Sequence, residues 1–228
     1  MHGARIRDWL DGEPYVFLDP ALDNRGAKTT TDPTFLESVA PEGTQRIVVG
    51  LSEFSEYSRP GETSFDHSVV VVYPFDERAC ELLREIIVEG RVKRMLIIVW
   101  SSRYLVADML EGLGAMNLFT GTTAPVPDPL QLAAADAMVA EQYNGLGSGR
   151  GKDAVIQLLR AFSDEGYLLD ESWIRALFAA GGTFRSAESV AKFLTEMNDG
   201  VRHRVRQRFV SDIVRVLREQ LGSPLDQV

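Results

Sequence analysis

Apolar and polar residues alternate along the first half of the chain in blocks that have the lengths of strands and helices. Two runs rich in β-branched residues, Ser68–Tyr73 and Met95–Trp100, flank an amphipathic run from Asp76 to Arg94. Strands that are buried on both faces of a parallel sheet give such apolar runs, and a long helix is the usual crossover between parallel strands. With a further helical run, 102–114, and a short apolar piece, 116–119, the pattern predicts strand-helix-strand-helix-strand.

Two earlier apolar runs, Tyr15–Leu18 and Arg46–Leu51, predict two more short strands. The first half therefore indicates an α/β fold, a Rossmann-like and mostly parallel sheet of about five strands. Pro125 and Pro127 interrupt regular structure after Gly121. We place a domain boundary there, with an α/β domain over residues 1–122.

The remaining residues, 123–228, predict a helical module. The helical spacing of apolar residues covers five segments: 129–143, 153–163, 171–180, 187–197 and 201–221. Asp170 and Ser186 are suited to cap two of these helices. The glycine-rich stretch 144–153 departs from the phosphate-binding loop, because Leu146 and Asp153 stand where that loop has Gly and Ser or Thr. It predicts a hinge between helices.

Composition is that of a globular protein. The 228 residues are 45% apolar, and the longest apolar run, about six residues, is far below the roughly 20 that a membrane helix needs. We expect no membrane association. A single cysteine, Cys80, and the lack of an apolar N-terminal leader favour the reducing cytoplasm. The net charge of −9 disfavours unspecific binding to nucleic acid by the chain as a whole.

A candidate anion site follows from the predicted sheet, because ligands of open parallel sheets bind beyond the carboxyl ends of the strands. Ser101 and Ser102 are expected to start a helix there, so that hydroxyls and backbone N–H groups converge on one spot and Arg103 closes over it. The residues predicted to bind a small, phosphate-bearing ligand are Ser101, Ser102, Arg103, Thr120, Gly121, Thr122 and Asp76. The alternative is that they are ordinary cap and turn residues.

A second hypothesis is a metal-dependent enzyme that acts on nucleotides or nucleic acid. Asp19 and Asp76 each follow a predicted buried strand, and two carboxylates can hold a divalent cation. Val16–Asp19 resembles the first motif of haloacid dehalogenase-like phosphatases and of PIN-like nucleases. The next acid, Asp23, is four positions on instead of two, which departs from the phosphatase pattern.

The last predicted helix is a basic island in an acidic chain. At 100° per residue, Arg204, Arg208, Arg215 and Arg218 would lie within a sector of roughly 80°. Such a stripe can contact nucleic acid or a partner protein, or it can pair with acidic groups of its own chain.

The sequence favours a non-catalytic regulatory or scaffold protein. The α/β domain would recognise the anionic ligand, and the helical module would assemble with a protein partner or with a second copy of the chain. The histidines, His2, His67 and His203, are too scattered for a zinc set, and Ser101 has no histidine assignable to it for a hydrolase triad. No cofactor, metal or catalytic residue is assigned, and whether the protein is an enzyme is left open.

Overall fold

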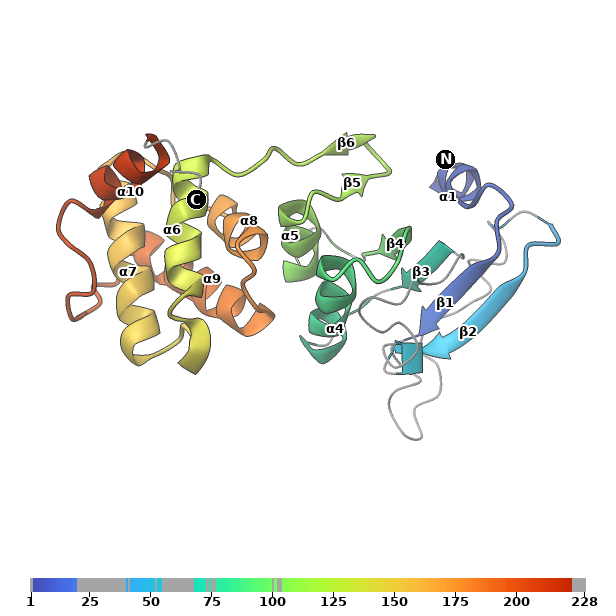
Figure 1. Cartoon of the computed structure of the whole chain (residues 1–228), viewed down its shortest axis with the longest axis horizontal. Helices are drawn as coiled ribbons and strands as arrows, with labels where there is room; N and C mark the ends of the chain where they lie inside the picture. Colours follow the sequence, from blue (N-terminus) through green and yellow to red (C-terminus); the bar gives the residue numbers. More distant parts are fainter. Residues whose placement is uncertain are drawn as a thin grey trace, which may run out of the picture. The chain divides into compact units, whose positions relative to one another are not determined.

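The computed structural model contains two compact units (Figure 1). One consists of Met1–Ser102 with Asn117–Thr122, and the other of Arg103–Met116 with Thr123–Val228. The structure describes residues 2–19, 40, 42–51, 53–54, 68–72, 74, 77–99, 101 and 104–222. The chain passes between the units after Ser102, after Met116 and after Thr122, and the predicted division at residue 122 stays a prediction.

The first unit contains a sheet of four described strands, all parallel, in the order β2-β1-β3-β4. The strands are β1 (Tyr15–Asp19), β2 (Arg46–Gly50), β3 (Ser68–Val72) and β4 (Met95–Ile98). Val69 pairs with Met95 and Val72 with Ile98, so β3 and β4 are parallel neighbours. The α/β class is therefore confirmed, whereas the Rossmann-like type stays a prediction.

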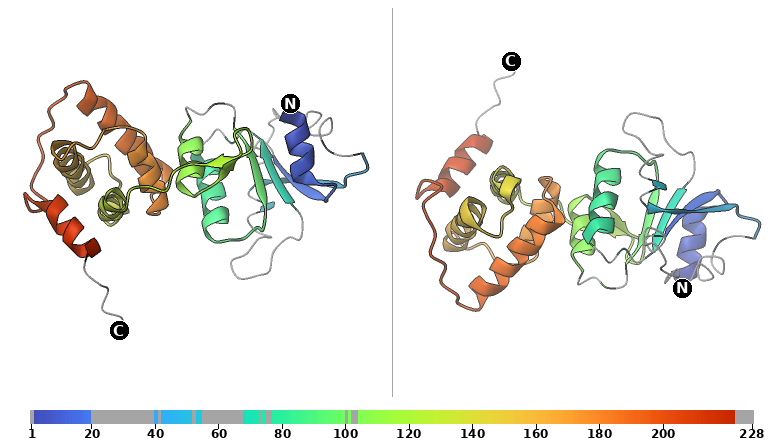
Figure 2. Two further views of the ribbon diagram at one scale, coloured as in Figure 1. Left: turned by 90° about the horizontal axis from the view of Figure 1, so that it is seen from above. Right: turned by 90° about the horizontal axis from the view of Figure 1, so that it is seen from below.

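The two faces of this sheet are covered by different helices, α1 (His2–Leu10) and α4 (Glu77–Val88) (Figure 2). Alternate strand residues explain the two layers, because successive side chains of a strand point to opposite faces. Tyr15, Phe17, Val70 and Val72 pack toward α1, and Val16, Leu18, Val69 and Val71 pack toward α4. Since all of these side chains are buried, each contributes about 1.5–3 kcal/mol of hydrophobic stabilisation.

The predicted fifth strand over residues 116–119 is not part of this sheet. Its first two residues form β5 (Met116–Asn117), which pairs with β6 (Thr122–Thr123) in a separate two-stranded sheet. The strand ends early because the Asn117 side chain folds a turn: its Oδ1 accepts hydrogen bonds from the backbone N–H groups of Phe119 and Thr120. Leu118 instead packs against the core beneath α1.

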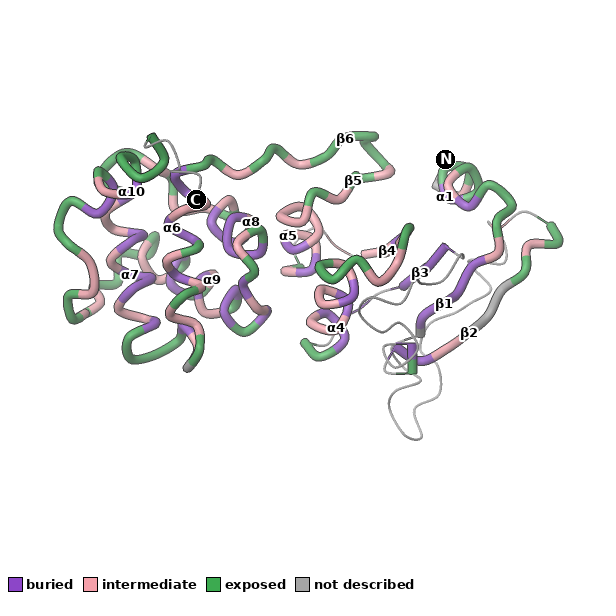
Figure 3. Tube along the Cα trace, in the orientation of Figure 1, coloured by how far each residue is buried: buried purple, intermediate pink, exposed green. Residues whose placement is uncertain are grey.

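The second unit is helical. Its helices are α5 (Leu105–Gly112), α6 (Pro129–Val139), the 3₁₀ turn η2 (Gln142–Asn144), α7 (Gly149–Asp164), α8 (Ser172–Ala179), α9 (Phe184–Asn198) and α10 (Ile213–Gly222). Figure 3 shows their buried faces. At the centre, Phe162 meets Trp173 edge to face with ring centroids 5.0 Å apart. None of the described helices combines the length and the apolar content that crossing a membrane requires.

Side-chain caps fix where two of these helices begin. Asp128 accepts hydrogen bonds from the N–H groups of Leu130 and Gln131, with Pro129 as the first residue of α6. Thr183, and not Ser186 as predicted, caps α9. Ser186 lies inside the helix and donates its N–H to the Thr183 hydroxyl, 3.2 Å away, so α9 begins three residues earlier than its apolar pattern suggests.

The predicted hinge over 144–153 is also wrong in its second half, because α7 already begins at Gly149. Gly151 is buried in its first turn. A Cβ atom there would lie 2.4 Å from the carbonyl oxygen of Gly145, so glycine is needed for the close approach of the loop to the helix. The glycines therefore serve packing as well as the turn.

The predicted helix 201–221 is helical only in its second half, as α10. Residues 201–212, which we call the strap, have an irregular backbone that ends in a turn before α10. Two side chains of α7 hold the strap in place. Gln157 accepts from the N–H groups of Arg208 and Phe209, at 2.9 and 3.3 Å. Arg160 donates to the carbonyl of His203 at 2.7 Å.

Candidate functional site

The anion site was predicted at the carboxyl edge of the parallel sheet. Asp19 ends β1 in register with Gly50 at the end of β2, while Val72 and Ile98 end the other two strands side by side. Half-buried Ser101 follows β4. Asp76, Ser102 and Arg103, together with the side chain of Asp19, lie outside the described residues. The strand geometry on which the site depends is therefore present, and its ligand set stays a prediction.

The helix expected to start at Ser101 or Ser102 begins later. Its first residue is Leu105, and the preceding Tyr104 has an extended backbone, with φ −85° and ψ 141°, and makes no side-chain cap. The N–H groups at the start of α5 are therefore those of Leu105 and the residues after it.

The predicted residues Thr120, Gly121 and Thr122 belong to the exposed turn between β5 and β6. The structure brings the two threonine hydroxyls to 2.7 Å of each other. Gly121, at φ +72°, donates its N–H to the Asn117 carbonyl at 2.8 Å. These contacts close the turn itself, which is the structural role that the sequence left as the alternative.

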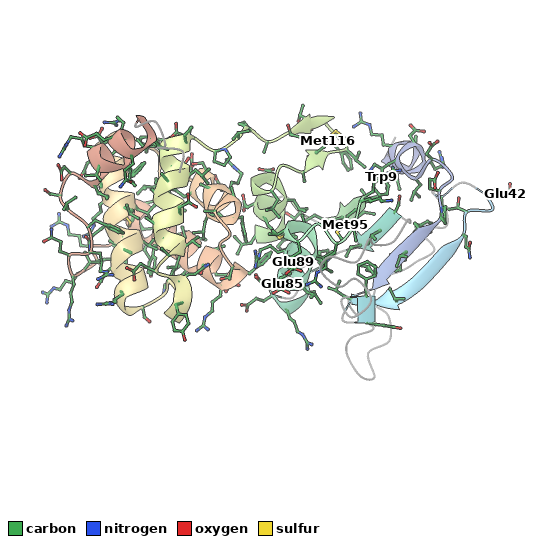
Figure 4. The ribbon with its side chains drawn as sticks, viewed as in Figure 1. Trp9, Glu42, Glu85, Glu89, Met95 and Met116 are labelled. Atoms are coloured by element: carbon green, nitrogen blue, oxygen red, sulfur yellow. The ribbon has the colours of Figure 1, made fainter. Side chains whose placement is uncertain are left out.

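This turn is attached to α1. The Arg5 guanidinium donates to the carbonyl oxygen of Leu118 at 2.6 Å. Arg94, just before β4, lies 4.5 Å from the centre of the Trp9 ring and donates to the carbonyl oxygen of Trp9 (Trp9 and Met116 are labelled in Figure 4). Two arginines thus hold α1 to the turn and to the segment that leads into β4.

The arginine stripe predicted for the C-terminal helix is divided between two kinds of backbone. Arg204 and Arg208 lie in the strap, and only Arg215 and Arg218 are on α10. Arg208 pairs with Glu141, Arg215 with Asp212 and Glu219, and Arg218 with Glu165 at 3.2 Å. Hydrogen bonding to Arg215 lowers the pKa of Asp212. Contact of all four with nucleic acid or a partner stays a prediction, and three of them are engaged with carboxylates of their own chain.

A half-buried carboxyl group that the sequence analysis missed lies where α5 packs against α8. Burial raises the pKa of Asp108 to about 6, against the opposing attraction of Arg175. The Arg175 Nη1 atom lies 3.8 Å from Asp108 and 3.3 Å from Glu111. A polar residue within the apolar face of a short helix, four positions before Gly112, was the signal that could have revealed it.

A second missed residue is His203. Its side chain is only 6% exposed and lies 3.4 Å from the Glu196 carboxylate. Burial, followed by the charge of Lys152, lowers its pKa below the ordinary value of 6.5. The apolar spacing of Val201, Val205 and Phe209 obscured this residue, because it predicted a helix with His203 in an exposed basic run.

Within the described part of the chain, no group of three or more histidine, cysteine, aspartate and glutamate side chains is arranged to hold a metal ion. Comparison with protein-family models, with curated protein sequences and with solved structures gives no match to this chain.

Proposed function

We propose that this chain is a non-catalytic scaffold or regulatory protein that assembles through its helical module and recognises a small phosphate-bearing ligand with its α/β domain. The observation that carries the proposal is the exposure of large apolar side chains in the helical unit. Tyr143, Val126 and Leu168 are 96%, 88% and 74% exposed, the highest values among the large apolar side chains described. Single exposed apolar residues are common, but tyrosine in particular anchors protein interfaces.

The assembly can be tested by light scattering over about a hundredfold range of protein concentration. We expect the mean mass to rise with concentration, and Tyr143→Ser and Leu168→Ser to weaken the association. Val88→Ser is the matched control, because Val88 is 55% exposed but lies on α4 of the other unit. A constant monomer mass, or equal weakening by all three variants, would contradict self-assembly through the helical unit.

The ligand half of the proposal rests on the four parallel strand ends and on Ser101 beyond β4. Inorganic phosphate and nucleoside phosphates are suitable probes, because a ligand of the folded state raises its melting temperature. We expect these probes to raise the melting temperature, and Arg103→Ala and Ser101→Ala to reduce that rise. Thr120→Ala tests the predicted ligand residue in the turn between β5 and β6. Unchanged melting temperatures across the panel would exclude the ligand, and metal-dependent cleavage of nucleic acid that Asp19→Ala abolishes would overturn the non-catalytic assignment.

We place this scaffold in the reducing cytoplasm. The one cysteine, Cys80, is a buried thiol whose Sγ lies 3.6 Å from the Pro74 carbonyl oxygen, as expected for a cysteine that serves packing.

A further inference from the structure

The strap is attached to the helical unit by hydrogen bonds between its backbone and side chains of α7. Its amide and carbonyl groups bind side chains of α7: Gln157 contacts the backbone at Arg206, Arg208 and Phe209, and Arg160 contacts it at His203. Together with the ion pair between Arg208 and Glu141, these side-chain contacts stand in place of a helical ladder. The strap is therefore a segment that can detach locally while the helices stay folded.

The side chain of His203, in the strap, is only 6% exposed and packs against the helices. Its ring lies edge-on to Phe193 of α9, with centroids 5.6 Å apart. Its Nε2 atom is buried and lies 3.4 Å from Oε2 of Glu196, but it makes no hydrogen bond among the described residues. The free energy of the closed strap therefore depends on whether this imidazole is protonated.

The charged groups around this ring are mostly cations. Lys152 and Arg160 face it from α7, and Lys192 and Glu196 face it from α9. Glu196 is also shared, because Lys192 lies 3.7 Å from its other oxygen. The neighbouring strap residues Arg202 and Arg204 are exposed. A proton on His203 would thus add a buried charge near three cations and one partly neutralised carboxylate.

We propose that His203 is a proton-operated latch, which holds the strap against α7 and α9 when the imidazole is neutral and releases it when the imidazole is protonated. The exposed, detached ring is solvated and can carry its charge at little cost, whereas the packed ring cannot. Release uncovers the strap-binding side chains of α7, together with Val205 and Phe209, which are half-buried when the strap is closed. The latch concerns the helical unit alone and does not require the proposed ligand or assembly.

The direction of the pH effect follows from the packing of a ring that is only 6% exposed beside Arg160, which binds the His203 carbonyl, and near Lys152 and Lys192; burial and these charges lower the pKa of His203. Because the detached strap regains the ordinary value of 6.5 while the attached one has a lower pKa, the detached form binds the proton more readily. Attachment is therefore complete above pH 6.5 and is lost progressively as the pH falls below it. The increase in opening is at most about tenfold for each pH unit below the ordinary value.

Amide hydrogen exchange at Arg208 and Phe209 reports on this opening, because both N–H groups bind Gln157 only when the strap is closed. In the intact chain we expect protection, corrected for the intrinsic pH dependence of exchange, to be up to about tenfold lower near pH 5.5 than near pH 7.5. His203→Gln should show equal protection at both values. Gln157→Leu should lack protection at both, which identifies the open state.

The Lys152→Gln variant tests the electrostatic cause, because it removes a cation that lowers the pKa of His203. The pH dependence should shrink in this variant. The latch is overturned if His203→Gln loses protection on acidification as the unmodified chain does. If His203→Gln does not fold, NMR titration of the His203 imidazole in the unmodified chain provides the test. A titration midpoint at or above pH 6.5 would also overturn the proposal.

Discussion

At the scale of single residues, Asp108 carries the clearest electrostatic cost in the described structure. Its ionised form is less favourable in the folded chain because burial raises its pKa from 3.8 to about 6, while Arg175 attracts it and Glu111 and Glu171 repel it. The folded state therefore loses stability as the pH rises from 3.8 to 6, and the penalty is complete above 6.

Asp108→Asn, which cannot ionise, should gain stability relative to the original chain as the pH increases. We expect the difference between the two chains to change by on the order of 1 kcal/mol between about pH 4 and pH 7.5, after allowance for partial exposure to solvent. Urea unfolding at the two values measures it. Asp164→Asn, at an exposed position of α7, is the control, and an equal pH dependence in both variants would contradict the assignment.

At the scale of elements, the close contact between α5 and α8 depends on glycine at position 112, which has no side chain. A Cβ atom on Gly112 would lie 2.5 Å from the Arg175 carbonyl oxygen and 3.2 Å from Cβ of Phe178. Backbone cannot move aside as a flexible side chain can, so we expect Gly112→Ala to destabilise the chain by about 1–3 kcal/mol. The matched control is Gly222→Ala, also at the last residue of a helix but with open space around it.

Gly222→Ala should be neutral or stabilising by up to about 1 kcal/mol, since alanine is the better helix former. Denaturant midpoints of the two variants provide the comparison. If both alanines have the same effect, the helices do not approach closely at Gly112.

The elements also show where sequence patterns are sufficient. The strands were predictable because Val69–Val72 and Met95–Ile98 are short, uninterrupted apolar runs. Such runs are typical of strands buried on both faces of a sheet. The strap was not predictable, because Val201, Val205 and Phe209 have helical spacing although its arginines, Arg202 with Arg206 and Arg204 with Arg208, would repel across each turn of a helix. Backbone N–H groups of the strap donate instead to the side chain of Gln157, which is distant in sequence.

The candidate site was predictable to the same limited extent. Parallel strands follow from local pattern and chain topology, and the structure puts Asp19, at the end of β1, in register with Gly50, at the end of β2. The turn at Thr120–Thr122 depends on the side chain of Asn117, and the environments of Asp108 and His203 depend on which helices pack together. A single sequence contains the amphipathic face of a helix but not the identity of its partner.

At the scale of the whole molecule, the place of α5 decides how the chain can be divided. The sequence grouped residues 102–114 with the α/β domain, whereas α5 belongs to the helical unit and packs there against α8. Val106 and Met109 are buried, and removal of such side chains costs several kcal/mol in total.

A fragment 103–228 should therefore unfold cooperatively at a higher temperature than a fragment 123–228, which lacks α5. Calorimetry of the two fragments provides the measurement. Equal melting temperatures would contradict the inclusion of α5 in the helical unit. If the longer fragment melts at a higher temperature and Gly112→Ala abolishes that difference, the gain in stability comes from the contact between α5 and α8.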